Sequence, residues 1–200
     1  NFSLELAFPQ MIANGLGMDI SNSFLIAASP APRASVAGDT LAFHYSVDRI
    51  PAYCKETRFV RVGGAPVQVL YRRLGKTEDD APASSEVRFA VAAQDEYALG
   101  KVFTLDFIDI ITQEGWSYQQ VAKYLQDYLG VLVQVGAFAT GTSLTTHLQV
   151  PGRFFDVIPQ NIVIAPDGQP ILIDKEWQLE LPIEIGQLLF RSLLALIKAV

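Results

Sequence analysis

Residues 155–177 read FDVIPQNIVIAPDGQPILIDKEW, and this stretch decides the fold. The Asp-Gly pair at 167–168 favours a two-residue type I′ turn, which predicts a β-hairpin around it. In that register Asn161 faces Asp174 at the open end of the hairpin, with the two Cα atoms about 5 Å apart. The strands on either side are apolar on both faces, so we expect the hairpin to be buried.

Polar residues gather at the open end of this apolar hairpin. Asp156 lies five residues before Asn161, and Asp174 follows the second strand. Buried polar groups are costly unless something binds them. Mg²⁺ prefers oxygen ligands and takes few from the protein, leaving the rest to phosphates and water. A further Asp can accept the proton of an attacking hydroxyl. The alternative without a functional site is a hairpin whose polar ends face solvent.

The composition narrows the class of protein. The chain has 200 residues, of which 50% are hydrophobic and 18% charged, so it is not a disordered chain. Its net charge of −6 argues against a nucleic-acid partner, because such binding needs a basic surface. A single cysteine, Cys54, excludes an internal disulfide and favours a reducing, cytoplasmic compartment. We expect no transmembrane segment, since charges interrupt even the apolar run 188–200.

The pattern along the chain changes near its middle. The β-rich residues 1–95 predict an antiparallel N-lobe, residues 96–101 (EYALGK) a hinge, and residues 102–200 a mainly helical C-lobe. We therefore expect an α+β fold of two lobes, with a cleft at the connector that suits a small molecule. The expected strands include 23–28, 41–46, 56–62, 67–74 and 87–92, and the expected helices include 2–13, 105–111, 118–135 and 183–200.

The hairpin and the loop before it resemble a known catalytic segment. A D-x-x-x-x-N spacing from Asp156 to Asn161, followed by Asp174 after the next strand, resembles the protein-kinase-like superfamily. With Pro159 and the sequence IDKEW, it looks closer to the aminoglycoside phosphotransferase and choline kinase branch. The resemblance implies a two-lobed kinase-like fold. It also implies Asp156 as catalytic base, Asn161 and Asp174 as Mg²⁺ ligands, and ATP as the phosphoryl donor.

Two further stretches extend this resemblance. Glu96 and Tyr97, followed by a glycine, resemble the branch's hinge, which implies that they contact the nucleotide. The segments NSFL, FHYS and LFR, taken with DKEW, resemble the kinase-like segment downstream of a methyltransferase domain in bacterial surface-polysaccharide proteins. Some of those proteins also carry glycosyltransferase domains. The resemblance implies a C-lobe truncated after its hairpin and one further helix, a small-molecule or glycan acceptor, and partners in adjacent domains of a longer chain.

The nucleotide-binding side departs from the kinase pattern. A GxGxxG loop is absent from the sequence, and the likely N-lobe strand offers Arg72 or Arg73 where a kinase has a lysine. We take Arg72 as the phosphate-binding cation and interpret Lys55 as surface charge. These departures keep a second hypothesis open. The domain would then be a non-catalytic, pseudokinase-like module that positions an adjacent methyltransferase or glycosyltransferase domain.

Overall fold

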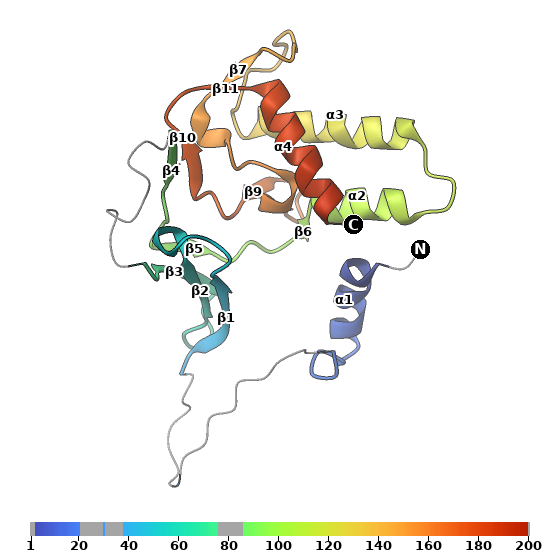
Figure 1. Ribbon diagram of the computed structural model, residues 1–200. Helices are drawn as coiled ribbons and strands as arrows, with labels where there is room; N and C mark the ends of the chain where they lie inside the picture. Colours follow the sequence, from blue (N-terminus) through green and yellow to red (C-terminus); the bar gives the residue numbers. More distant parts are fainter. Residues whose placement is uncertain (1–2, 21–29, 31–37, 76–85, 200) are drawn as a thin grey trace. The chain divides into compact units, whose positions relative to one another are not determined.

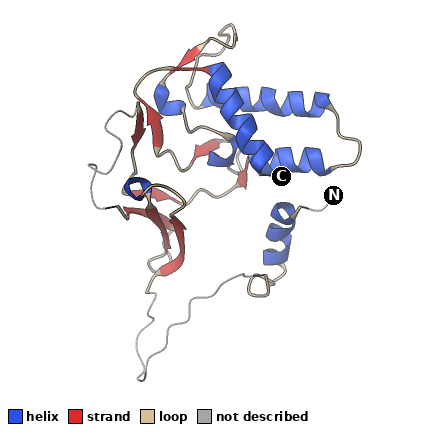
Figure 2. Cartoon of the chain, in the orientation of Figure 1, coloured by secondary structure: helices blue, strands red, loops and turns tan. Residues whose placement is uncertain are grey.

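The computed structural model describes residues 3–20, 30, 38–75 and 86–199 (Figure 1). It confirms the expected α+β class, with helices and antiparallel strands along the chain (Figure 2). The described residues form two compact units. The smaller unit takes residues 7–20, 30, 38–75 and 92–97, and the larger takes residues 3–6, 86–91 and 98–199.

The smaller unit is built on a four-stranded antiparallel sheet in the order β1-β2-β3-β5. Its strands are β1 (Thr40–Ser46), β2 (Lys55–Val60), β3 (Gln68–Arg73) and β5 (Gln94–Glu96), with a short 3₁₀ helix η1 (Pro51–Tyr53) before β2. The first three confirm the strands expected from the sequence. Helix α1 (Leu4–Ala13) has no buried residue. The strand expected at 23–28 lies outside the described residues.

The larger unit combines three helices with three small sheets. Its helices are α2 (Thr104–Thr112), α3 (Tyr118–Gln134) and α4 (Ile185–Lys198), with short 3₁₀ helices η3 (Gly152–Phe154) and η4 (Pro159–Asn161). The first sheet has three strands, β6 (Lys101–Val102), β8 (Ile162–Ile164) and β9 (Pro170–Leu172). The second sheet pairs β7 (Gln149–Val150) with β11 (Ile183–Glu184), and the third pairs β4 (Val87–Phe89) with β10 (Trp177–Leu179). Strand β4 therefore joins this unit, although it lies within residues 1–95.

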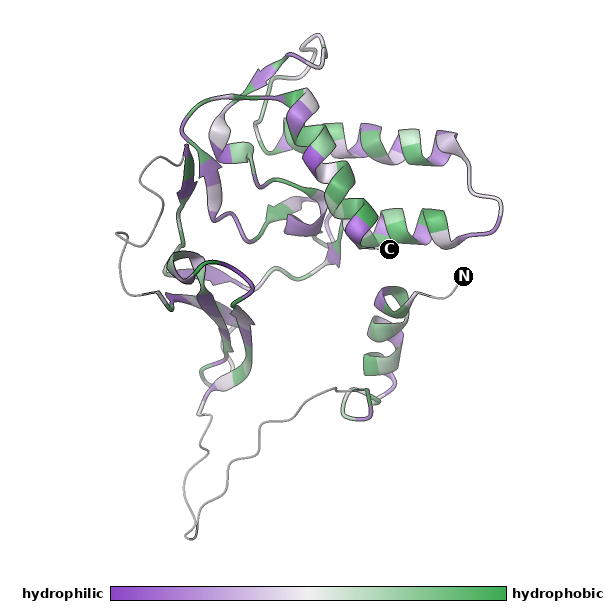
Figure 3. Cartoon of the chain, in the orientation of Figure 1, coloured by the Kyte–Doolittle hydropathy of each residue, from purple (hydrophilic) through white to green (hydrophobic). Residues whose placement is uncertain are grey.

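Local sequence explains why α3 forms where it does. Ser117 caps the helix, because its hydroxyl accepts from the backbone N–H of Gln120 while the Gln120 side chain accepts from the backbone N–H of Ser117. Apolar and polar residues alternate along the helices (Figure 3). The buried side chains of α3 recur at helical spacing and join the core of the larger unit; they are Tyr124, Tyr128, Val131 and Leu132.

The hairpin between β8 and β9 differs from the sequence prediction by one residue of register. Ile162 pairs with Leu172, and Ile164 pairs with Pro170. The turn has three residues, because the backbone N–H of Gly168 donates to the carbonyl of Ala165 at 2.8 Å. The predicted two-residue turn is therefore wrong.

Proline explains the change. Pro166 has no N–H with which to close a two-residue turn, whereas it is favoured at the second position of a type I turn. Gly168 follows with φ 83°, completing a three-residue hairpin with a bulge. As a consequence Asn161 faces Ile173, whose N–H donates to the Asn161 carbonyl at 2.9 Å. The prediction that Asn161 faces Asp174 is also wrong.

Candidate functional site

Asp156 is a buried carboxylate in the loop that joins η3 to η4. Only 5% of the residue is exposed. Nη2 of Arg191, on α4, donates to Asp156 Oδ1 at 2.8 Å, and the Arg191 guanidinium carbon lies 4.3 Å from the centre of the Phe155 ring. The aspartate is therefore both deeply buried and paired with a cation from its own chain.

The electrostatics of Asp156 reflect this setting. Burial raises the pKa of Asp156 to about 6, and the nearby Glu176 carboxylate acts in the same direction. The ion pair with Arg191 and the backbone N–H of Trp177 oppose that rise in the pKa. A carboxyl group with a pKa near 6 is a stronger base than an ordinary aspartate while still being largely ionised at neutral pH.

Asn161 closes the loop onto Asp156. Its side-chain Nδ2 donates to the backbone carbonyl of Asp156 at 3.0 Å, and its backbone N–H donates to the carbonyl of Ile158 at 2.8 Å. Asn161 is itself buried. Because the amide nitrogen is committed to the loop, the amide oxygen is the atom that remains chemically suited to a cation. The structure thus brings Asp156 and Asn161 together, as the spacing predicts.

Asp174 follows the end of β9 in an unusual conformation. Its φ is 48°, and among the described residues it is the only non-glycine with positive φ. Aspartate tolerates this region better than most residues, but such conformations concentrate at functional positions. Asp174 is exposed. In the part of the chain that the structure describes, no group of three or more His, Cys, Asp or Glu side chains could hold a metal ion.

These observations limit the number of protein ligands that a metal ion could have at this site. Asn161 and Asp174 offer one amide oxygen and one carboxylate, the hard oxygen donors that Mg²⁺ prefers. Such a small donor set fits a cation that is carried mainly by phosphates and water. It does not fit a dedicated structural metal site, which would need more protein ligands.

The three other candidate residues lie in the smaller unit. Arg72 is 68% exposed at its side chain and pairs with Glu56 at 2.9 Å across β3 and β2, and its hydrogen bond lowers the pKa of Glu56. Glu96 ends β5 and is exposed. Tyr97 is 46% exposed and packs edge-on against Phe59, with ring centres 5.9 Å apart.

Lys55 corrects the sequence interpretation. It begins β2 and is only 2% exposed, so it is not surface charge. Its Nζ lies 5.0 Å from the centre of the Tyr71 ring, a cation–π contact within the same sheet. Of the Lys and Arg side chains in the described ranges, it is the one that is buried. Because it is buried, Lys55 has a role within the sheet that the sequence interpretation did not assign to it.

Sequence reasoning also missed the part played by Arg191. Its signal is a charged residue followed by Ser192 inside an otherwise apolar helix, LLFRSLLALI. Polar side chains inside such an apolar helix usually have a partner elsewhere in the fold. Trp177 has an ordinary packing role, because its ring stacks at an angle on Phe89 with centres 4.7 Å apart. This contact joins β10 to β4.

Comparisons with known proteins do not identify the chain: no protein-family model, curated protein or solved structure matches it. Among the helices in the described ranges, none combines the length and the apolar character needed to cross a bilayer.

Proposed function

We propose that this chain is a kinase-like phosphotransferase domain that uses Mg²⁺ and ATP on a small molecule or glycan. It would act in the cytoplasm within a larger bacterial surface-polysaccharide transferase. The observation that carries the proposal is the closed loop: Asn161 donates to the carbonyl of Asp156 at 3.0 Å and leads directly into the β8–β9 hairpin, after which Asp174 stands at φ 48°. A candidate base, a candidate amide ligand and a candidate carboxylate ligand thus follow one another in the same chain order as in the kinase-like segment that the sequence resembles.

Each residue then has a definite role. Asp156 orients the acceptor hydroxyl and takes its proton, and its raised pKa suits that step. The Asn161 amide oxygen and the Asp174 carboxylate would hold Mg²⁺, which would supply positive charge to the transferred phosphoryl group. Arg72 would contact the nucleotide phosphates, and Glu96 and Tyr97 would bind the nucleotide, as the resemblance implies.

One observation favours the second function, a non-catalytic module that positions an adjacent methyltransferase or glycosyltransferase domain. Arg191 already pairs with the Asp156 carboxylate, whose side chain is 6% exposed. A carboxylate neutralised by its own chain can serve purely to hold the loop in place. Turnover separates the two functions, because both retain the fold but only the first transfers a phosphoryl group.

Thermal unfolding with and without millimolar Mg²⁺ and ATP tests the proposal. A ligand at 100 times its Kd stabilises by about 2.7 kcal/mol, which for a chain of this size raises Tm by about 5–10 °C. We expect this rise in the wild type and its loss in Asp174→Asn. Asp167→Asn is the matched control, because Asp167 is exposed in the hairpin turn and Asn is well tolerated before glycine. No rise in the wild type would contradict the proposal.

A further inference from the structure

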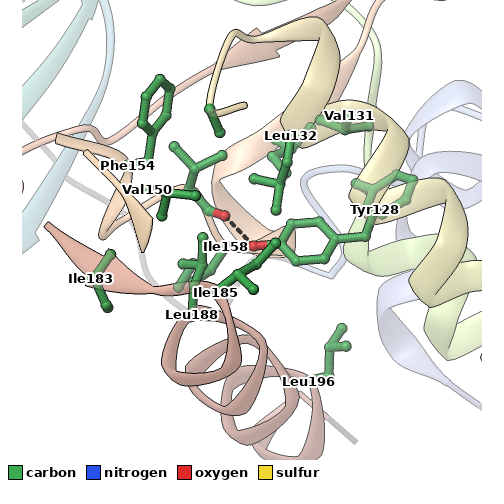
Figure 4. Packing of buried hydrophobic residues seen from close by; sticks show 14 of the residues in the cluster. Tyr128, Val131, Leu132, Val150, Phe154, Ile158, Ile183, Ile185, Leu188 and Leu196 are labelled. Atoms are coloured by element: carbon green, nitrogen blue, oxygen red, sulfur yellow. Dashed lines mark hydrogen bonds between the residues drawn. The ribbon is translucent and has the colours of Figure 1, made fainter. Parts of the chain in front are cut away.

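A pair of buried hydroxyls connects two helices to the loop that carries Asp156. Tyr128 on α3 is fully buried, and its hydroxyl donates to the backbone carbonyl of Val157 at 2.5 Å. Figure 4 shows Tyr128 reaching into the apolar core, with a dashed line at its hydroxyl. Ser192 on α4 is also fully buried and lies 2.9 Å from the Tyr128 hydroxyl oxygen.

The number of hydroxyl protons determines which of the two hydroxyls donates the hydrogen bond and which accepts it. The single hydroxyl proton of Tyr128 goes to Val157, so the tyrosine oxygen can only accept from Ser192. Ser192 has one proton as well, which it divides between Tyr128 and the carbonyl of Leu188 at 2.8 Å. Burial raises the pKa of Tyr128, so its hydroxyl keeps its proton in all ordinary buffers. The chain of donors therefore runs from Ser192 through Tyr128 to Val157.

The carbonyl that accepts from Tyr128 belongs to the residue next to Asp156. Val157 directly follows Asp156, and Arg191 directly precedes Ser192. Arg191 thus holds the Asp156 side chain directly, and the next residue of α4, Ser192, reaches the Val157 backbone through the Tyr128 hydroxyl. A purely apolar core would not fix the loop backbone in this way, because apolar contacts are not directional.

We infer that Tyr128 and Ser192 are positioning residues, whose hydroxyls set the backbone of residues 156–161 and with it the placement of Asp156 and Asn161. The claim about the loop stands on the packing alone. Its bearing on chemistry rests on the proposed function, through the nucleotide that Asn161 helps to bind.

The test replaces one hydroxyl at a time in the whole chain. Tyr128→Phe leaves the Val157 carbonyl buried without its donor, which corresponds to roughly a tenfold rise in local opening. We expect amide hydrogen exchange in residues 155–161 to accelerate by about that factor relative to the amides of α3. The carbonyl carbon resonance of Val157 should move as its hydrogen bond is lost. Ser192→Ala should produce the same changes at smaller amplitude, and it carries the test if Tyr128→Phe does not fold.

Tyr124→Phe is the matched control. Tyr124 lies one turn earlier on α3, is also buried, and donates to the Phe103 carbonyl at 3.4 Å, away from the loop. It should leave loop exchange and the Val157 resonance unchanged. Equal effects of Tyr124→Phe and Tyr128→Phe on the loop, or no effect of Tyr128→Phe and Ser192→Ala, would overturn the inference.

The nucleotide arm of the experiment separates this inference from the proposed function. The Kd for Mg²⁺ with ATP should rise in Tyr128→Phe and remain unchanged in Tyr124→Phe. If the wild type binds no nucleotide, the proposed function fails, while the exchange and resonance measurements still decide whether the hydroxyls position the loop.

Discussion

Replacing Arg191 by methionine removes the cation that pairs with the Asp156 carboxylate while keeping an apolar stem of similar length. The two side chains meet at 2.8 Å, with 6% of the Asp156 side chain and 36% of the Arg191 side chain exposed. Breaking a fully buried ion pair costs about 3–5 kcal/mol, whereas an exposed pair is worth about 0.2–1 kcal/mol. Because solvent reaches a third of Arg191, we expect Arg191→Met to lower the free energy of unfolding by about 2–3 kcal/mol at pH 7.5.

The same substitution should cost far less in acid. At pH 5 the unpaired Asp156 of the variant is protonated, since burial raises its pKa and the ion pair that opposed this rise is gone. The remaining loss in the free energy of unfolding comes mainly from the lost contact with the Phe155 ring, and it is about 0.5–1 kcal/mol. Urea unfolding of wild type and variant at both pH values measures the difference.

Arg153→Met is the matched control, because the Arg153 guanidinium carbon lies 4.7 Å from the centre of the neighbouring Phe154 ring. It should cost under about 1 kcal/mol at either pH. An equal loss of stability for Arg191→Met at pH 5 and pH 7.5 would refute the reasoning, because the cost would then not come from an unpaired buried charge.

Three further predictions concern stability. The folded protein binds the Asp156 proton more tightly than the unfolded chain, because the pKa of Asp156 is raised in the folded state. The free energy of unfolding of wild type, relative to that of Asp156→Asn, should therefore fall by about 3 kcal/mol as the pH rises from about 4 to about 6. Urea unfolding at a series of pH values measures this fall. Gly152→Ala should destabilise by about 1–3 kcal/mol or more in the same assay, because the new Cβ would lie 2.2 Å from the Leu179 carbonyl oxygen. Gly130→Ala, in open space within α3, should instead stabilise by about 0.5–1 kcal/mol. A flat pH profile, a Gly152→Ala variant that is as stable as wild type, or a Gly130→Ala variant that is less stable would count against these predictions.

Local patterns made parts of this fold predictable from the sequence. The spacing of apolar residues predicted the helix now found at Tyr118–Gln134 almost to its ends. The first three strands of the smaller unit follow from β-rich runs in the same way. The contact of Asn161 with Asp156 was also predictable, because both lie in one short loop.

Features that depend on a single turn residue or on distant contacts were not predictable in this way. Pro166 changes the hairpin register by one residue, so that Asn161 faces Ile173 instead of Asp174. The partner of Asp156 lies 35 residues away on α4, so only the packing of the larger unit brings Arg191 to it. The burial of Lys55 likewise depends on packing that the strand pattern does not encode.

The central claim is that a divalent cation and a nucleotide bind at the loop and at the residue after the hairpin. The most direct measurement replaces Mg²⁺ by paramagnetic Mn²⁺ with ATP and records the broadening of amide resonances along the chain, with Asp174→Asn for comparison. We expect broadening centred on residues 161 and 174, and we expect it to disappear in the variant. Broadening centred elsewhere, or none at millimolar ATP, would contradict it.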